Sequence, residues 1–350
     1  MHRTPFAPRP VALLALATGL ATSGAIGQPT ANHSAARATY VATLTEANVD
    51  NAALLYNRYF ALLDATDLPA LAREFDFNDP AARPDAKLAA LLDDNSALIA
   101  GIVRASEATT CDWGIERDQG PAALLTHLGP TRAAVRVLAA DARHQLAQGN
   151  HAAVVERHTA ILRMADHLTQ DRVLISSLVS MAVTGLAASE AEAIGTELPA
   201  EQRKQLFREF QSRAYAADPF GIREAMKGER ALFLDWVADT IDPADAGRAF
   251  LEVAQTAGVA ETTAATRIAR MSAAEIQADI KKAGSLYDAV DAVWNDPEAQ
   301  TKLAALSNLV ETGAYGQAAT IFAPNVTRIH DNDQQSRNTL EKAAETLAGL

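Results

Sequence analysis

Three polar residues occupy positions where the spacing of apolar residues predicts the buried face of a helix: Asn95, His158 and Glu229. A lone carboxylate is costly to bury, so Glu229 must be paired, protonated or next to a cavity. In one hypothesis, Glu229 and His158 act as the acid–base pair of a hydrolase-like enzyme, and Asn95 joins them as a ligand contact in one interior pocket. In the alternative, each of the three has a separate partner, such as an arginine, a backbone group or water.

Gly228, directly before Glu229, is a second unusual feature of the same predicted helix. Glycine within a helix costs up to about 1 kcal/mol relative to alanine. We therefore expect another backbone to pass close to Gly228.

Motifs for other chemistries are missing from the sequence. It contains no metalloprotease His-Glu-x-x-His, no Gly-x-Ser-x-Gly and no phosphate-binding glycine loop. Five histidines cluster between 127 and 167, but Gly149-Asn150 interrupts their spacing, so we expect surface and hairpin histidines and no metal site: His127, His144, His151, His158 and His167. No cofactor is predicted. The single cysteine, Cys111, is expected to be a half-buried small hydrophobe, because one cysteine forms no internal disulfide.

Residues 1–27 have the pattern of a secretory signal peptide. Arg3 and Arg9 precede an uncharged run over 11–27, and small residues suit cleavage near Ala25 to Gln28. This predicts an exported protein, periplasmic or secreted. The competing interpretation is an uncleaved anchor, which would make the chain a membrane-tethered structural protein.

The amino-acid composition limits the fold classes and the kinds of partner that are expected for this chain. Hydrophobic residues make up 49% of the 350 residues, aromatics only 5%, and the net charge is −12. Such a chain favours helices packed through small side chains. Its acidity argues against nucleic acid as a partner.

The helical pattern divides the chain into few parts. Residues 28–45 are expected to form a disordered leader, and 46–350 a single helical domain with a possible subdivision near 256–268. Helices are predicted around 51–64 and 86–106, and as an antiparallel hairpin joined at Gly149-Asn150. The uncharged run over 173–189 predicts a central buried helix rather than a membrane span.

Parts of the pattern resemble known proteins. Ala142, Gly149, Val154 and His158 in the hairpin resemble one tetratricopeptide-type repeat, and "ETGAYGQAATIF" is a weaker echo. More broadly, "CDWG", the Gly-Pro loop, the hairpin and "LISSLV" resemble a group of uncharacterised exported helical proteins of bacteria, which implies no particular activity.

Together these observations predict an all-α fold of stacked antiparallel helical hairpins, partly tetratricopeptide-like, without a sheet. We expect an exported scaffold that binds a protein or peptide partner or an unknown ligand, since the hairpin pattern comes without a catalytic motif.

Overall fold

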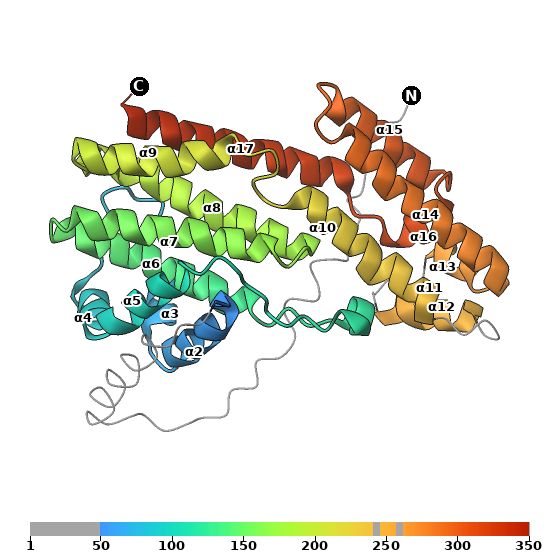
Figure 1. Ribbon diagram of the computed structural model, residues 1–350, viewed down its shortest axis with the longest axis horizontal. Coiled ribbons are helices and arrows are strands. Elements are labelled where there is room, and N and C mark those ends of the chain that lie inside the picture. Colours follow the sequence, from blue (N-terminus) through green and yellow to red (C-terminus); the bar gives the residue numbers. More distant parts are fainter. Residues whose placement is uncertain (1–49, 241–245, 257–261, 350) are drawn as a thin grey trace, which may run out of the picture.

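The computed structural model describes residues 50–240, 246–256 and 262–349 (Figure 1). Over these residues the fold is all-α, as predicted, and the described part of the chain contains no strand beyond one isolated bridge between Asn51 and Thr110. The predicted signal peptide (1–27) and leader (28–45) lie outside the described residues. Of the predicted subdivision near 256–268, residues 257–261 also lie outside.

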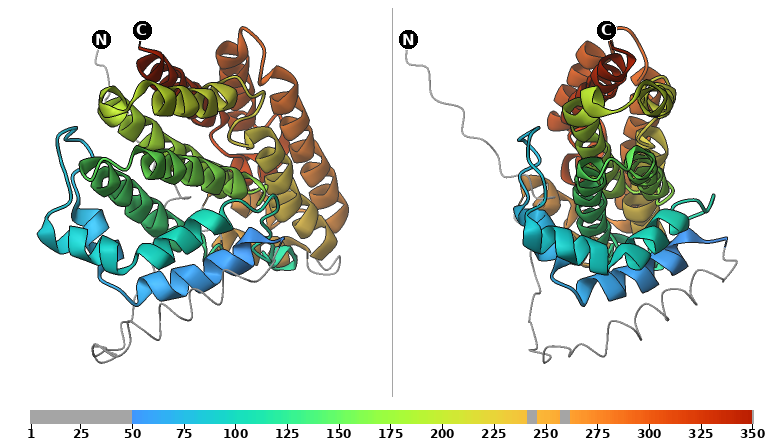
Figure 2. Two further views of the ribbon diagram at one scale, coloured as in Figure 1. Left: turned by 60° about the vertical axis from the view of Figure 1, so that its left-hand side comes forward. Right: turned by 90° about the vertical axis from the view of Figure 1, so that its left-hand side faces the viewer.

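The N-terminal helices are short and gather on one side of the molecule (Figure 2). They are α2 (Ala52–Asp64), α3 (Leu68–Glu74), α4 (Ala86–Asp94) and α5 (Ser96–Ala105). The 3-10 segment η2 (Arg117–Ala122) follows them in the sequence but packs against the C-terminal part of the chain.

The prediction of one helix over 86–106 is wrong in one respect. The chain breaks at Asn95, which ends α4 and precedes α5. The Asn95 side-chain amide donates to the carbonyl oxygen of Leu91 at 2.8 Å, so it binds the end of its own helix. Asparagine favours this local side-chain bond over a continuing helix.

Long antiparallel helices form the centre of the fold: α6 (Leu128–Ala147), α7 (His151–Thr169), α8 (Leu174–Ile194) and α9 (Ala200–Ala214). The short 3-10 segment η3 (Gly195–Glu197) connects α8 to α9. The α6–α7 hairpin turns at Gly149, whose φ of +76° favours glycine, as predicted. By length and composition α8 could cross a membrane, but most of its residues are buried against α6, α7 and α17, as predicted for a central helix.

The C-terminal part contains α10 (Ile222–Glu229), the π-helical segment η4 (Arg230–Asp235), α11 (Trp236–Thr240), α12 (Ala246–Thr256), α13 (Thr263–Ile268), α14 (Ala273–Val293), α15 (Ala299–Glu311), α16 (Gly316–Phe322) and α17 (Val326–Ala348). A capping box of Ser272 and Glu275 begins α14. Helix α17 returns along α9 and α8, and so joins the end of the chain to its centre (Figure 1).

The π-helical segment shifts the buried face of the helix that carries Glu229. Up to Glu229 the residues at helical spacing, Ile222, Met226 and Glu229, are buried. Beyond it, Leu232, Leu234 and Val237 are buried, whereas Phe233 and Trp236 are only half-buried. A π turn adds a residue to the helical repeat, so a 3.6-residue pattern loses register there.

Candidate functional site

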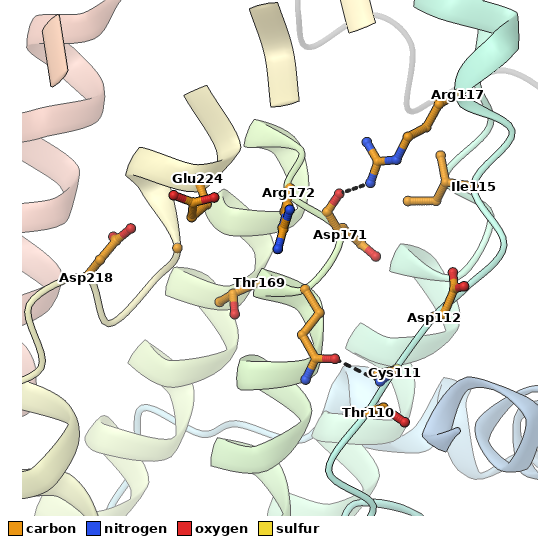
Figure 3. Close-up of a pocket in the computed structure, with 12 residues that line it drawn as sticks. Thr110, Cys111, Asp112, Ile115, Arg117, Thr169, Asp171, Arg172, Asp218 and Glu224 are labelled. Atoms are coloured by element: carbon orange, nitrogen blue, oxygen red, sulfur yellow. Dashed lines mark hydrogen bonds between the residues drawn. The ribbon is translucent and has the colours of Figure 1, made fainter. Parts of the chain in front are cut away.

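A polar cavity of about 590 Å³ lies where three segments that are distant in sequence meet (Figure 3). The segments are the connection over 110–117, the α7–α8 turn over 169–172 and the chain entering α10 over 218–224. Its lining residues are Thr110, Cys111, Asp112, Ile115, Arg117, Thr169, Gln170, Asp171, Arg172, Asp218, Gly221 and Glu224. We call this space the polar cavity.

The α7–α8 turn holds an unusual backbone conformation. Arg172 has a φ of +51° and is the only non-glycine residue with positive φ in the described part of the chain. Its amide donates to the carbonyl oxygen of Thr169 at 3.2 Å, which closes the turn. The left-handed conformation is unfavourable for a residue with a Cβ, so the surroundings must impose it.

Helix α10 supplies much of that constraint. A Cβ at Gly228 would lie 1.7 Å from the carbonyl oxygen of Arg172, so the two backbones touch, which confirms the predicted close approach. Next to it, Glu229 Oε1 accepts from the amide of Leu174 at 3.0 Å. No side chain of the α7–α8 turn caps α8, so Glu229 does so from another helix.

Glu229 caps α8 at a cost in free energy, because its carboxylate is buried. The residue is 7% exposed, and burial raises the pKa of its carboxyl to about 7, although the hydrogen bond from Leu174 lowers it in part. Proton binding by Glu229 is therefore coupled to the turn that carries Arg172.

The connection over 110–117 is fixed at both ends. Asn51 bonds the backbone of Asp112 in both directions, at 2.9 Å each, and the Cys111 amide donates to Gln170 Oε1 at 2.8 Å. Further along, the Trp236 indole donates to the carbonyl oxygen of Asp118 at 2.7 Å. The 110–117 wall of the cavity is thus tied to α2, to the α7–α8 turn and to α11.

Asp171 is held by two neighbours. Its carboxylate is 2.8 Å from His127 Nε2, and both side chains are buried. The Trp113 ring stacks on His127 with centroids 4.4 Å apart. On the other side, the Arg117 guanidinium donates to the Asp171 backbone carbonyl (Figure 3).

The other charged side chains that line the polar cavity carry charges of both signs. The Arg172 guanidinium donates no hydrogen bond to a described residue. Glu224 lies close enough to Arg172 to be affected: the hydrogen bond from Lys227 lowers the pKa of Glu224, and Arg172 lowers it further. Asp112 is exposed at the opposite wall, and the Asp218 carboxylate caps α10 through the amides of Ile222 and Arg223.

None of the hydroxyl or thiol groups that line the polar cavity is activated. Burial raises the pKa of the Cys111 thiol, and Asp171 raises it further, so the thiol stays protonated. The hydroxyl of Thr110 donates to the carbonyl oxygen of Asp50 at 2.6 Å, and that of Thr169 to the carbonyl oxygen of Asp166 at 2.7 Å. No base accepts a proton from either threonine.

The three residues singled out by the sequence have separate partners. Glu229 binds Leu174, Asn95 binds Leu91, and His158 Nδ1 lies 2.9 Å from the carbonyl oxygen of Val154. Burial lowers the pKa of His158, so the ring is neutral and donates through Nδ1. No hydrogen bond or ion pair joins any two of the three within the described ranges. Their convergence in one pocket stays a prediction.

The expectation of surface and hairpin histidines holds for their place in the hairpin, since all but His127 lie on α6 or α7, but it is wrong about exposure for four of the five. His127, His144, His158 and His167 are buried. Each has a different partner: Asp171 for His127, Asp93 for His144, the Val154 carbonyl for His158, and Tyr56 with the Ala108 carbonyl for His167. Helix packing brings these acceptors close, which the spacing of histidines does not reveal.

Sequence reasoning missed Asp171, Arg172, Arg117 and Asp218, because turn residues show no periodic pattern. Cys111, which was noted for its chemistry, does line the cavity, and it is buried rather than half-buried.

Comparison with protein-family models, with curated proteins and with solved structures found no match to this chain.

Proposed function

We propose that this protein is an exported helical binding protein whose polar cavity takes a small zwitterionic molecule, such as an amino acid or the exposed termini of a short peptide. The observation that carries the proposal is the combination of carboxylates on facing walls of one cavity with an Arg172 guanidinium that has no hydrogen-bond partner among the described residues. Its volume of about 590 Å³ is in the range of small-molecule sites.

The cationic side of the cavity suits a carboxylate. Arg172 offers its whole guanidinium, and Arg117 keeps further N–H groups after its bond to the Asp171 carbonyl. A planar guanidinium binds a carboxylate through two parallel hydrogen bonds, which fixes orientation as well as charge.

The anionic side suits an ammonium group. Asp112 on one wall and Glu224 on another present carboxylate oxygens to the same space, and Glu224 also accepts a hydrogen bond from Lys227 at 2.6 Å through Oε1. A ligand with a single charge would leave one side of the cavity without a partner, whereas a zwitterion satisfies both.

Binding is favoured over covalent catalysis by the state of the potential nucleophiles. Cys111 is held as the thiol, and the hydroxyls of Thr110 and Thr169 are occupied by backbone carbonyls. A nucleophilic mechanism needs one of these groups next to a base.

The strained turn supports the same interpretation. Arg172 adopts its left-handed conformation because Gly228 and Glu229 fix the backbone around it. Strain of this kind is often retained where it positions a functional side chain.

The test is isothermal titration calorimetry of the full chain with a panel of amino acids and dipeptides. We expect at least one member to bind, and N-acetylation or C-amidation of that ligand to weaken binding by at least about tenfold, because each removes one charged contact. Asp112→Asn should weaken binding of the free ligand but not binding of its N-acetylated form. The proposal is contradicted if no member binds, or if the capped forms bind as tightly as the free one.

Export is the second part of the proposal and rests on residues 1–27. We expect the mature protein to begin near Gln28. N-terminal sequencing of the protein from its native host would distinguish this from the retained anchor of a membrane-tethered protein, which would leave residues 11–27 in place.

A further inference from the structure

A second cavity, of about 190 Å³, lies between α3 and α6 and is lined by three arginines. Its lining residues are Pro69, Arg73, Gly129, Arg132, Ala133 and Arg136. We call it the arginine cavity. In a chain with a net charge of −12, three cations converging on one small space require an explanation.

Rigid packing brings the three arginines together. Arg73 lies in the last turn of α3, and Arg132 and Arg136 are one turn apart on α6. Between the two helices, Ala72 and Ala134 are fully buried, so the helices approach closely. This contact fixes the backbone positions from which the three arginine side chains reach the cavity.

No carboxylate compensates these charges within the described residues. None of the three guanidinium groups forms an ion pair or a hydrogen bond with a described residue, and all three side chains are exposed. Like charges at i and i+4 of a helix repel each other, and a third cation adds to the repulsion. An anion in the cavity would attract all three guanidinium groups and so offset their mutual repulsion.

The first turn of α6 opens onto the same space. A Cβ at Gly129 would meet no atom within 4 Å, so the helix backbone is accessible from the cavity. The positive end of the α6 dipole adds to the field of the arginines there.

A larger cavity of about 550 Å³ continues from the arginine cavity and shares Pro69, Arg73, Gly129 and Ala133 with it. Phe60, Asn57 and Thr126 line this adjoining cavity, together with His127 and Asp64. It therefore offers an aromatic ring, polar groups and the Asp64 carboxylate to the body of a ligand held at the arginines.

We propose that the arginine cavity binds the phosphate group of a small molecule, either free phosphate or an organic phosphate whose body occupies the adjoining cavity. A phosphate dianion can accept paired hydrogen bonds from several guanidinium groups at once, which a single carboxylate cannot do as completely. This site is separate from the polar cavity, so it does not depend on the proposed zwitterion.

The test is calorimetry of the full chain at low ionic strength with three probes: inorganic phosphate, phenyl phosphate and benzoate. We expect phosphate and phenyl phosphate to bind at least tenfold more tightly than benzoate. Tighter binding of phenyl phosphate than of phosphate assigns an organic ligand, and equal affinity assigns free phosphate. Failure of both phosphate probes to bind overturns the proposal.

Single-residue variants test whether phosphate binds in the arginine cavity. Arg132→Ala and Arg136→Ala should each weaken phosphate binding at least tenfold, and Arg132→Lys should weaken it less, because the charge remains while the paired geometry is lost. Arg208→Ala, which removes from α9 an exposed arginine without an ion pair among the described residues, should have no effect. All these side chains are exposed, so an unchanged thermal melt is expected and serves as the folding control. Equal phosphate affinity in wild type and in both alanine variants overturns the proposal.

Discussion

The two ends of the α6–α7–α8 layer carry similar residues in opposite states. At one end, which we call the closed end, Arg143 binds Glu190 through two hydrogen bonds of 2.6 and 2.9 Å, and neither side chain is accessible. The same arginine donates to the carbonyl oxygen of Pro80 at 2.6 Å. At the other end, the open end, Arg172 faces the polar cavity without a hydrogen-bond partner among the described residues.

The comparison shows that the surrounding backbone, not the residue type, decides whether an arginine is buried in an ion pair or faces a cavity. Arg143 lies within a helix, where α8 supplies a carboxylate and the connection between α3 and α4 supplies a backbone carbonyl group. Arg172 lies in a turn that α10 holds in an unfavourable conformation, with its head group left free. We infer that the closed end contributes stability and that the open end contributes binding.

The largest expected effect comes from breaking the closed end. Arg143→Met should lower the free energy of unfolding by about 3 to 5 kcal/mol, because Glu190 remains buried without its partner. The double variant Arg143→Met/Glu190→Leu should recover most of that loss, since neither charge then remains. Urea unfolding measures both changes. A single variant within about 1 kcal/mol of wild type would show that the pair is structurally unimportant.

Glu229 gives the open end a pH dependence. Its pKa is about 7 in the folded protein against an ordinary 4.5, so the folded state binds this proton more tightly than the unfolded state. The resulting stability is complete below pH 4.5 and is lost as the pH rises through 7. The difference corresponds to about 3 kcal/mol, at roughly 1.4 kcal/mol for each unit of pKa.

Glu229→Gln isolates this contribution, because glutamine keeps an acceptor for Leu174 but does not titrate. We expect the wild type to lose stability relative to the variant between pH 4.5 and pH 8, as measured by urea unfolding at several pH values. Parallel stability profiles for the two proteins would contradict the assignment.

Gly228→Ala tests the contact between α10 and the turn. The new Cβ would lie 1.7 Å from the Arg172 carbonyl oxygen, so one backbone must move. We expect a loss of about 1 to 3 kcal/mol in thermal or urea unfolding. Binding at the polar cavity should weaken as well, because the turn carries Arg172. Gly185→Ala on α8 is the control, since a Cβ there would meet nothing within 4 Å.

The smallest effect on stability is expected at Arg172 itself. Arg172→Gly removes the side chain and suits the positive φ, and the gain is partly offset by the greater freedom of glycine in the unfolded chain. The free energy of unfolding should stay within about 1 kcal/mol of wild type, or rise. A larger loss would mean that the guanidinium stabilises the turn and that Arg172 belongs with Arg143 as a structural residue.

The sequence predicts most of the fold because helix formation and burial depend on local spacing. The α6–α7 hairpin and the buried central helix α8 follow from that spacing. The pattern misleads at Asn95, where a side-chain hydrogen bond ends the helix, and in the π-helical segment after Glu229, where the helical repeat changes.

The site was only partly predictable, for a physical reason. Gly228 and Glu229 are anomalous within a helical pattern, so they pointed to a close backbone contact and to a buried carboxylate. The partner of Glu229 is a main-chain amide, and every non-proline residue carries one, so the sequence could not identify Leu174. Arg172 lies in a turn, where no repeating pattern marks an unusual residue.

The central claim is that the charges at the open end are kept free for a ligand. The most direct measurement is the ratio of dissociation constants of wild type and Arg172→Gly for the tightest amino acid or dipeptide ligand, with Arg208→Ala as the control. We predict that Arg172→Gly binds at least about tenfold more weakly while its melting temperature is unchanged or higher, and that the control binds as wild type does. Equal affinity of wild type and Arg172→Gly would contradict the claim.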